Sequence, residues 1–304
     1  MNFDFEHTLN QNIKLPKAAS FELFLKREDQ LHAFVSGNKY RKLKYNLLEA
    51  DKHGMKTILT FGGAYSNHIA AVASAGNILG FKTIGVIRGE ELVAEVNKNP
   101  TLHFAKENGM QFKFVTRSAY RDKTDVAFIN NLKEEFGDFY LVPEGGTNAL
   151  AVEGCEEILK ASDNVFDFIC CPVGTGGSIS GLINASNPAQ KVLGFPVLKG
   201  SFLHKDISRF VSKSNWELIN DYHFGGYAKV DKKLIDFINW FKSENDILLD
   251  PIYTSKMLYG VFDLIEKNYF PEGSKILAIH TGGLQGIHGM NEQLRRKNLP
   301  LIKV

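Results

Sequence analysis

The architecture follows from the stretch Phe168-Ile169-Cys170-Cys171-Pro172-Val173-Gly174-Thr175-Gly176-Gly177-Ser178. An apolar run ends at a glycine-rich turn and small residues follow, which is typical of a buried strand that gives way to a helix. Glycines let an anion approach the backbone, and the free N–H groups at a helix start carry partial positive charge. The stretch therefore predicts an anion-binding turn at the carboxyl end of a strand.

A second stretch has the same order of features and reads Ile58-Leu59-Thr60-Phe61-Gly62-Gly63-Ala64-Tyr65-Ser66-Asn67-His68. One turn could hold a cofactor phosphate and the other a substrate carboxylate. A merely structural tight turn is the alternative for either turn alone. A dinucleotide fingerprint does not fit, because Ile179 stands where its third glycine would fall, and no Gly-Lys-Ser/Thr of a Walker A motif follows.

Short apolar runs alternate with helical patterns along the rest of the chain. The runs span residues 57–61, 82–87, 112–115, 139–142, 166–173, 191–197 and 275–280. This alternation predicts an α/β fold with parallel strands. Ligand-binding loops are expected beyond the carboxyl ends of these strands, where both glycine turns fall.

A lysine suited to imine chemistry stands in Phe34-Val35-Ser36-Gly37-Asn38-Lys39-Tyr40-Arg41-Lys42. Lys39 follows a Ser-Gly-Asn turn at an expected helix start, where partial positive charge should lower the pKa of its amine. Only the neutral amine attacks an aldehyde, so Lys39 is a candidate for Schiff-base chemistry. The alternative is a solvated helix face made of Lys39, Arg41, Lys42 and Lys44, with Leu43 and Leu47 pointing inward.

Composition favours a globular enzyme. The chain has 304 residues, of which 44% are apolar and 23% charged, and its formal charge is +2. Its basic runs are short and no long apolar segment occurs, so neither a nucleic-acid nor a membrane partner is expected. Residues 1–6 lack the features of a signal peptide, which predicts a cytoplasmic protein. The three cysteines fit neither a disulfide framework nor a metal site, and Cys170 and Cys171 are expected in the core.

A series of motifs, taken in order, resembles a known family. They are Leu25-Lys26-Arg27-Glu28-Asp29, Gly37-Asn38-Lys39-x-Arg41-Lys42-Leu43, Gly62-Gly63-x-x-Ser66-Asn67-His68, Gly145-Gly146-Thr147-Asn148, Val173 to Ser178, Asp250-Pro251-Ile252-Tyr253 and His280-Thr281-Gly282-Gly283. The chain resembles the tryptophan-synthase-β-like (fold type II) pyridoxal-phosphate enzymes, within them the aminocyclopropane-carboxylate deaminase and D-cysteine desulfhydrase group. The resemblance implies two lobes with three-layer parallel sheets: a smaller lobe of residues 42–151 and a larger one of 1–41 plus 152–304. It places pyridoxal 5'-phosphate in the cleft between them and implies a homodimer.

The resemblance also assigns roles to individual residues. Lys39 would bind the cofactor covalently and act as the base, and Asn67 would donate a hydrogen bond to the cofactor's phenolic oxygen. The phosphate would lie on Val173, Gly174, Thr175, Gly176, Gly177 and Ser178. Ser66, Asn67 and His68 would bind the substrate carboxylate, with Ser66 as an accessory catalytic residue. Tyr227 and Tyr253 match two active-site tyrosines, and Tyr253 would assist the leaving group.

Simpler roles exist for some of these residues. His68 could be a structural histidine, Tyr253 a core aromatic residue with a tethered hydroxyl, and Thr254 a helix N-cap. A strand-end structural role is expected for His280.

Two positions indicate which reaction the chain catalyses. The deaminase has Glu and Leu where this chain has Thr254 and Thr281 beside the expected pyridine nitrogen. A glutamate would keep that nitrogen protonated and help to open a cyclopropane, whereas a threonine hydroxyl suffices when a thiolate leaves. The predicted reaction is therefore elimination from a small D-amino acid, either D-cysteine or a β-substituted alanine. From D-cysteine it would give pyruvate, ammonia and sulfide. Aminocyclopropane-carboxylate deaminase is the alternative, followed by an amino-acid racemase or a non-catalytic protein that binds the cofactor.

Overall fold

The computed structural model describes residues 8–15, 20–32, 34–35, 37–200 and 202–304. The helices are α1 (Asn38–Lys52), α2 (Asn67–Leu79), α3 (Pro100–Glu107), α4 (Val126–Phe136), α5 (Ala149–Glu156), α6 (Gly177–Ala185), α7 (Phe202–Ser208), α8 (Lys232–Asn245), α9 (Thr254–Glu266) and α10 (Gly286–Arg296). The strands are β1 (Asn10–Asn12), β2 (Glu22–Lys26), β3 (Thr57–Gly62), β4 (Lys82–Arg88), β5 (Gln111–Val115), β6 (Tyr140–Val142), β7 (Phe168–Val173), β8 (Lys191–Pro196), β9 (Trp216–Leu218) and β10 (Lys275–Ile279). Ser36 of the predicted turn and residues 1–6 lie outside the described residues.

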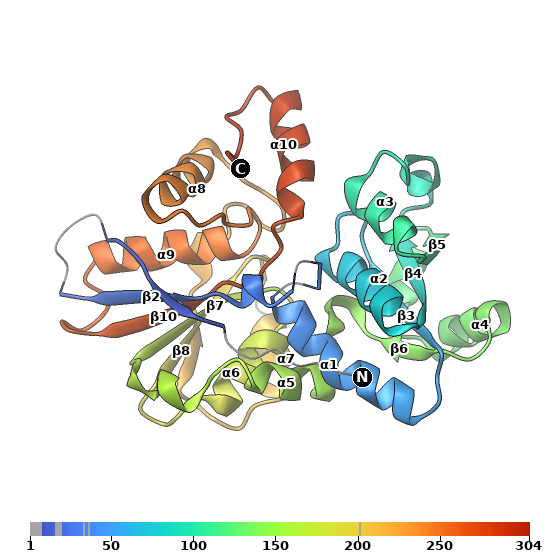
Figure 1. The fold of residues 1–304 in the computed structure, drawn as a ribbon, viewed down its shortest axis with the longest axis horizontal. Helices are drawn as coiled ribbons and strands as arrows, with labels where there is room; N and C mark the ends of the chain where they lie inside the picture. Colours follow the sequence, from blue (N-terminus) through green and yellow to red (C-terminus); the bar gives the residue numbers. More distant parts are fainter. Residues whose placement is uncertain (1–7, 16–19, 33, 36, 201) are drawn as a thin grey trace.

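The strands form two separate sheets, one at each end of the molecule (Figure 1). The smaller sheet has the order β5-β4-β3-β6 and is entirely parallel. The larger sheet has the order β1-β2-β10-β7-β8-β9, and its strands run parallel except for β1, which is antiparallel to β2. The predicted parallel α/β fold is confirmed.

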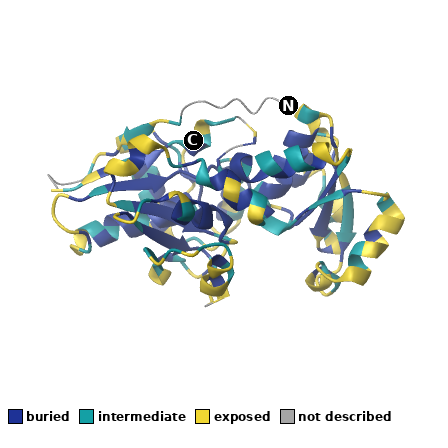
Figure 2. Ribbon diagram, turned by 90° about the horizontal axis from the view of Figure 1, so that it is seen from below, coloured by how far each residue is buried: buried dark blue, intermediate teal, exposed yellow. Residues whose placement is uncertain are grey.

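Helices cover both faces of each sheet, because successive residues of the buried strands point to opposite sides. On β10, Ile276 and Ala278 pack in a cluster with α8 and α9, whereas Leu277 and Ile279 pack in another cluster with α6 and α7. The smaller sheet is covered in the same way, by α1, α2 and α3 on one face and α4 on the other. Figure 2 shows the resulting buried layers in both parts of the molecule.

Every strand predicted from the sequence is present, with ends shifted by at most two residues. The short strands β1, β2 and β9 were not predicted. Cys155, Cys170 and Cys171 are buried free thiols, so the expected core position of the strand cysteines is confirmed. The smaller sheet falls within residues 42–151, but α1 and α5 run across those two limits, and the division into lobes stays a prediction.

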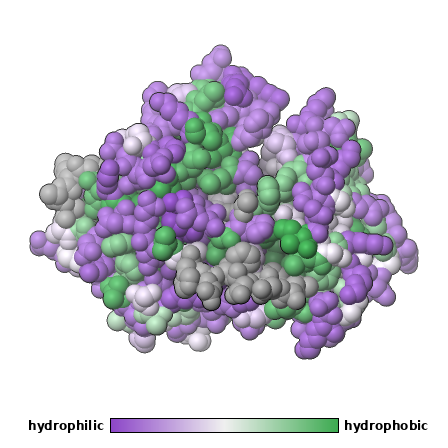
Figure 3. All heavy atoms as spheres, viewed as in Figure 1, coloured by the Kyte–Doolittle hydropathy of each residue, from purple (hydrophilic) through white to green (hydrophobic). Residues whose placement is uncertain are grey.

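The face of the molecule drawn in Figure 3 carries both hydrophilic and hydrophobic side chains. No helix in the described part of the chain is long and apolar enough to cross a membrane. Within the same residues, no group of three or more His, Cys, Asp or Glu side chains is arranged to hold a metal ion.

Helix α1 lies between the sheets and is fixed by a buried ion pair. Arg41 donates two hydrogen bonds to Glu28, Nε to Oε2 at 2.9 Å and Nη2 to Oε1 at 3.1 Å, and both side chains are at most 5% exposed. Lys42 on the same helix is also buried. The solvated-face alternative for this stretch is therefore wrong at both positions.

We expect Arg41→Met to lower the free energy of unfolding by about 3–5 kcal/mol, because it leaves the Glu28 carboxylate buried without its cation. Lys44→Met is the matched control on the same helix. Lys44 pairs with Glu157 at 2.6 Å, but both side chains are more than a fifth exposed, so the loss should stay below about 1 kcal/mol. Guanidinium unfolding midpoints of both variants measure the difference, and equal losses would contradict the importance of the buried pair.

Candidate active site

A cavity of about 500 Å³ lies where the carboxyl ends of both sheets face each other. Many of its lining residues lie at or just after the carboxyl ends of β3, β4 and β6 in the smaller sheet and of β7, β8 and β10 in the larger one. Most of the predicted site residues line it, namely Lys39, Ser66, Asn67, His68, Val173, Gly174, Thr175, Gly176, Ser178, Tyr227, Tyr253 and Thr281. Gly177 and Thr254 are buried and are not among the lining residues. The volume suits a cofactor together with a small substrate.

Lys39 reaches the cavity because of how α1 begins. Gly37 has φ 63°, and a Cβ there would lie 2.0 Å from the Thr281 carbonyl oxygen, so only glycine permits this close approach. Asn38 Nδ2 donates to Ser178 Oγ at 2.7 Å and thereby ties α1 to the start of α6. Asn38 Oδ1 in turn accepts a hydrogen bond from Lys39 Nζ at 3.2 Å.

Burial, together with the positive charge of Lys42, lowers the pKa of Lys39 to about 7. The predicted direction of this shift agrees with the structure. The cause predicted from the sequence was the helix terminus, whereas desolvation is the largest cause in the folded protein. A large fraction of the Lys39 amine is therefore neutral and nucleophilic near neutral pH.

In the cofactor-free protein we expect the acylation rate of Lys39 to rise about tenfold per pH unit below pH 7 and to level off above it. The sign follows because only the deprotonated amine reacts, and a lowered pKa supplies that form at lower pH. Pulsed labelling with acetic anhydride followed by peptide mass spectrometry measures it. Exposed Lys52, labelled in the same samples, is the control. Parallel profiles for the two lysines would contradict the buried, shifted amine.

Lys42 is a site residue that the sequence interpretation missed. Its Nζ donates to the Gly145 carbonyl at 3.0 Å, to Thr147 Oγ1 at 3.0 Å and to Thr175 Oγ1 at 3.4 Å. Burial lowers its pKa, and these three acceptors are uncharged. The signal in the sequence was its spacing, because a residue three positions after Lys39 lies on the same helix face.

The start of α6 completes an anion cradle beside Lys42. The first N–H groups of a helix have no partner within it, and Gly176, the N-cap, supplies no side chain to cap them. A Cβ on Gly177 would lie 2.9 Å from Thr147 Oγ1 and 3.1 Å from Lys42 Nζ. The glycines thus keep the space between the helix start and the ammonium open, which suits a phosphate.

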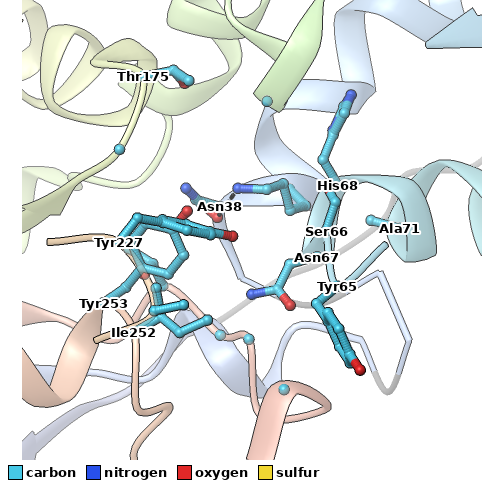
Figure 4. Close-up of a pocket in the computed structure, with 18 of the residues that line it drawn as sticks. Asn38, Tyr65, Ser66, Asn67, His68, Ala71, Thr175, Tyr227, Ile252 and Tyr253 are labelled. Carbon is cyan, nitrogen blue, oxygen red and sulfur yellow. Dashed lines mark hydrogen bonds between the residues drawn. The ribbon is translucent and has the colours of Figure 1, made fainter. Parts of the chain in front are cut away.

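The loop before α2 supplies the second set of predicted residues. Ser66 Oγ accepts from the Ile69 N–H at 3.4 Å and caps the helix. Asn67 Oδ1 accepts from Gln285 Nε2 at 3.1 Å, which leaves the Asn67 NH₂ group to donate. Figure 4 shows Asn67 facing Tyr227 and Ile252, whereas Tyr65 points away from them.

His68 is held in a structural arrangement although it borders the cavity. Thr60 Oγ1 donates to the Val142 carbonyl at 2.8 Å, so it accepts from His68 Nε2 at 2.9 Å. Burial, and then the charges of Lys39 and Lys42, hold the pKa of His68 well below its ordinary value. The neutral ring is suited to packing and supplies no positive charge for a carboxylate.

Tyr227 and Tyr253 form the wall of the cavity that faces Asn67 (Figure 4). The Tyr227 and Tyr253 rings meet edge to face with centroids 6.2 Å apart. Tyr227 is 42% exposed, and Tyr253 lines the cavity beside Gly174. Burial, and then the neighbouring Tyr227, raise the pKa of Tyr253 well above its ordinary value, so its phenol stays protonated and can donate. The tethered-core alternative for Tyr253 does not fit this position.

Thr254 does not cap α9. Tyr253 is the N-cap residue, and the Asp250 carboxylate accepts the N–H groups of Ile252, Tyr253 and Thr254 at 2.9, 2.8 and 2.7 Å. Thr254 is fully buried, and its hydroxyl has no hydrogen-bond partner in the part of the chain that the structure describes. The N-cap alternative is wrong, because Asp250 performs that function.

His280 has the structural role expected for it. Its Nδ1 accepts from the Gly282 N–H at 3.2 Å, so the proton is on Nε2, which donates to the Leu248 carbonyl at 2.8 Å. The histidine thereby fixes the turn that carries Thr281. Arg88, at the end of β4, also lines the cavity and was not predicted, although a charged residue at the end of an apolar strand could have indicated it.

A half-buried lysine with a lowered pKa, facing an anion cradle between two α/β sheets, defines a class of enzymes that hold a phosphorylated aldehyde. Residues 9–282 match the family described as "Pyridoxal-phosphate dependent enzyme", and the chain belongs to that family. The cofactor and the fold predicted from the sequence are confirmed.

Named relatives and a solved structure match nearly the full chain. The "Bifunctional D-cysteine desulfhydrase/1-aminocyclopropane-1-carboxylate deaminase, mitochondrial" of Arabidopsis thaliana is 30% identical, over 90% of this chain and 75% of that protein. A "1-aminocyclopropane-1-carboxylate deaminase" of Bradyrhizobium sp. (strain ORS 278) is 26% identical, over 90% of each chain. A crystal structure titled as an "ACC deaminase homologue" superposes with a TM-score of 0.83 at 28% identity, covering 96% of this chain and 94% of that one.

The residues of the cavity fit pyridoxal phosphate on structural grounds. The glycine cradle and the Lys42 ammonium match a phosphate, and the Lys39 amine matches an aldehyde. Thr281, one of the two threonines predicted to lie beside the pyridine nitrogen, lines the cavity as well.

Proposed function

We propose that this enzyme eliminates the β-substituent of a small D-amino acid, with D-cysteine as the substrate. One D-cysteine and one water would give pyruvate, ammonia and hydrogen sulfide. The observation that carries the proposal is the pair of uncharged threonines at the two positions predicted to lie beside the pyridine nitrogen. Thr281 lines the cavity, and the buried Thr254 directly follows the lining residue Tyr253. The carboxylate of the same turn, Asp250, is already engaged by three backbone N–H groups and is not free for the cofactor.

Pyridoxal phosphate supplies an electron sink when it is bound. The chain's own residues supply the proton transfers. Lys39, with a pKa of about 7, is the base that removes the proton from the substrate Cα. Tyr253, protonated and facing the cavity, donates a proton to the departing sulfur. The N–H groups that begin α2, with the Asn67 amide, bind the substrate carboxylate.

The name of the Arabidopsis relative includes D-cysteine desulfhydrase, and this supports a substrate of D configuration with a thiol as the leaving group. Aminocyclopropane-carboxylate deaminase is the second candidate, because the Bradyrhizobium relative carries that name and the matching crystal structure is titled as an ACC deaminase homologue. Thr254 favours elimination, since a threonine hydroxyl does not enforce protonation of the pyridine nitrogen as a glutamate would. The homodimer implied by the resemblance and the cytoplasmic location expected from the sequence belong to the same proposal. Light scattering of the purified protein tests the homodimer.

Thr254→Glu tests the assignment at this position. We expect the wild type to have a kcat/KM for D-cysteine that exceeds the value for aminocyclopropane carboxylate by about 100-fold or more, and the variant to reduce that ratio at least about tenfold. Thr254→Ser, which retains the hydroxyl, is the matched control and should keep the wild-type ratio. An unchanged ratio in Thr254→Glu would remove the argument for elimination. Interconversion of D- and L-amino acids without keto-acid release would indicate a racemase instead.

A further inference from the structure

Lys256, in the first turn of α9, is a buried cation that the proposed chemistry does not use. It is 1% exposed, and it follows Tyr253 and Thr254 on the same short segment. Both burial and the positive end of a helix disfavour an ammonium at this place. Such a group persists only when specific acceptors surround it.

Those acceptors belong to the loop that carries Tyr227. Lys256 Nζ donates to the His223 carbonyl at 2.9 Å and to the Gly226 carbonyl at 2.8 Å. Within the described part of the chain, no carboxylate forms a salt bridge with Lys256. The ammonium is therefore held by the two loop carbonyls.

The loop adopts an unfavourable backbone conformation. Phe224, Gly225, Gly226 and Ala228 have φ values of 53°, 91°, 120° and 54°. Left-handed φ values are strained for residues other than glycine, here Phe224 and Ala228. The Gly225 N–H donates to His223 Nδ1 at 2.9 Å, a contact within the loop itself. The two bonds from Lys256 are what connects these carbonyls to α9.

Tyr227 is the side chain that this loop brings to the cavity. It lies between Gly226, whose carbonyl Lys256 binds, and the strained Ala228, and its ring rests edge-on against Tyr253. Lys256 therefore joins, through one ammonium, the two elements that supply the tyrosine wall seen in Figure 4.

We propose that Lys256 is a positioning residue that fixes Tyr227 against Tyr253 and so shapes the wall that binds the substrate. The part that concerns substrate rests on the proposed function. Burial lowers the pKa of Lys256 to about 8, opposed by the negative charges of Asp250 and of Asp231 at the start of α8. The side chain therefore keeps most of its charge at neutral pH, and the two carbonyls have a cation to bind.

A double-mutant cycle tests the route through Tyr227. We expect Lys256→Met to raise the KM for D-cysteine about tenfold while kcat changes less than about threefold, the size of effect for a lost charged hydrogen bond. In a Tyr227→Phe background, Lys256→Met should add less than about twofold, because the side chain that it positions is already altered. Lys229→Met, which removes an exposed charge from the same loop, is the control and should have no effect. Full additivity of Lys256→Met and Tyr227→Phe would contradict the proposal.

Proteolysis tests the anchor without any turnover. Chymotrypsin should cleave after Phe224 or Tyr227 at least about tenfold faster in Lys256→Met than in the wild type, because the loop opens without unfolding the rest. If Lys256→Met does not fold, Lys256→Gln, whose amide still donates, should show an intermediate rate. An unchanged cleavage rate in Lys256→Met would show that Lys256 does not anchor the loop. If D-cysteine is not consumed at all, the proposed function fails, whereas the cleavage rates still decide the role of Lys256.

Discussion

Lys39→Ala is expected to lower the rate of amino-acid consumption on the order of 10³-fold or more, because it removes both the cofactor's covalent partner and the proposed base. No neighbouring group can replace it. Lys42 is the nearest alternative amine on α1, but its three hydrogen bonds hold it at the phosphate cradle. The variant should bind pyridoxal phosphate without the near-visible absorbance band of the lysine-bound form. Steady-state assays and absorbance spectra measure the two effects.

The control for this variant is Lys44→Ala on the same helix. Lys44 is half-buried, pairs with Glu157 at 2.6 Å and does not line the cavity, so its loss should leave activity and spectrum unchanged. A Lys39→Ala protein with the wild-type absorbance band would show that another amine holds the cofactor. In that case the central residue of the site would be wrongly assigned.

Lys42→Met is expected to weaken cofactor binding by about 10- to 100-fold, the size expected when a charge-assisted hydrogen bond to phosphate is lost. The same change should stabilise the cofactor-free protein, because Lys42 is a buried ammonium with only neutral acceptors at Gly145, Thr147 and Thr175. The two effects have opposite signs, which separates a phosphate ligand from a residue that merely supports the fold.

Two measurements on the Lys42 variant check this. Inorganic phosphate should raise the unfolding temperature of the cofactor-free wild type and should have a smaller effect on Lys42→Met. Fluorescence titration with pyridoxal phosphate gives the change in affinity directly. Equal phosphate stabilisation of both proteins would contradict a role of Lys42 in the cradle.

The strands that could be predicted are those whose own residues form a recognisable pattern. β3 and β7 are apolar runs that end at glycine turns. The alternation of such runs with helical patterns was enough to predict the parallel strands of both sheets. β2 was missed because it reads Glu-Leu-Phe-Leu-Lys, and Lys26 is buried only because Asp163, far along the chain, pairs with it at 2.9 Å. β9 is a three-residue edge strand whose pairing with β8 leaves no pattern of its own.

The site divides in the same way. Lys39 and the glycine turns are marked by local sequence, and the structure brings them together around one cavity. The pKa of Lys39 is lowered by burial between the two sheets and by the charge of Lys42. The burial arises only when distant parts of the chain fold together, so the local sequence around Lys39 could not reveal it. The Asp250 carboxylate caps α9 from four residues before Thr254. The sequence interpretation considered only the residue at the helix start, Thr254, as the cap. The anchoring of the Tyr227 loop by Lys256 spans 30 residues and has no sequence signature.

The most direct test of the proposed reaction is to incubate the wild-type holoenzyme separately with D-cysteine, L-cysteine and aminocyclopropane carboxylate and to identify the keto acid released from each. We expect pyruvate with equimolar sulfide and ammonia from D-cysteine, and little product from the other two. Release of 2-oxobutyrate from aminocyclopropane carboxylate at a higher rate than pyruvate from D-cysteine would contradict the role inferred from Thr254 and would make the enzyme a deaminase.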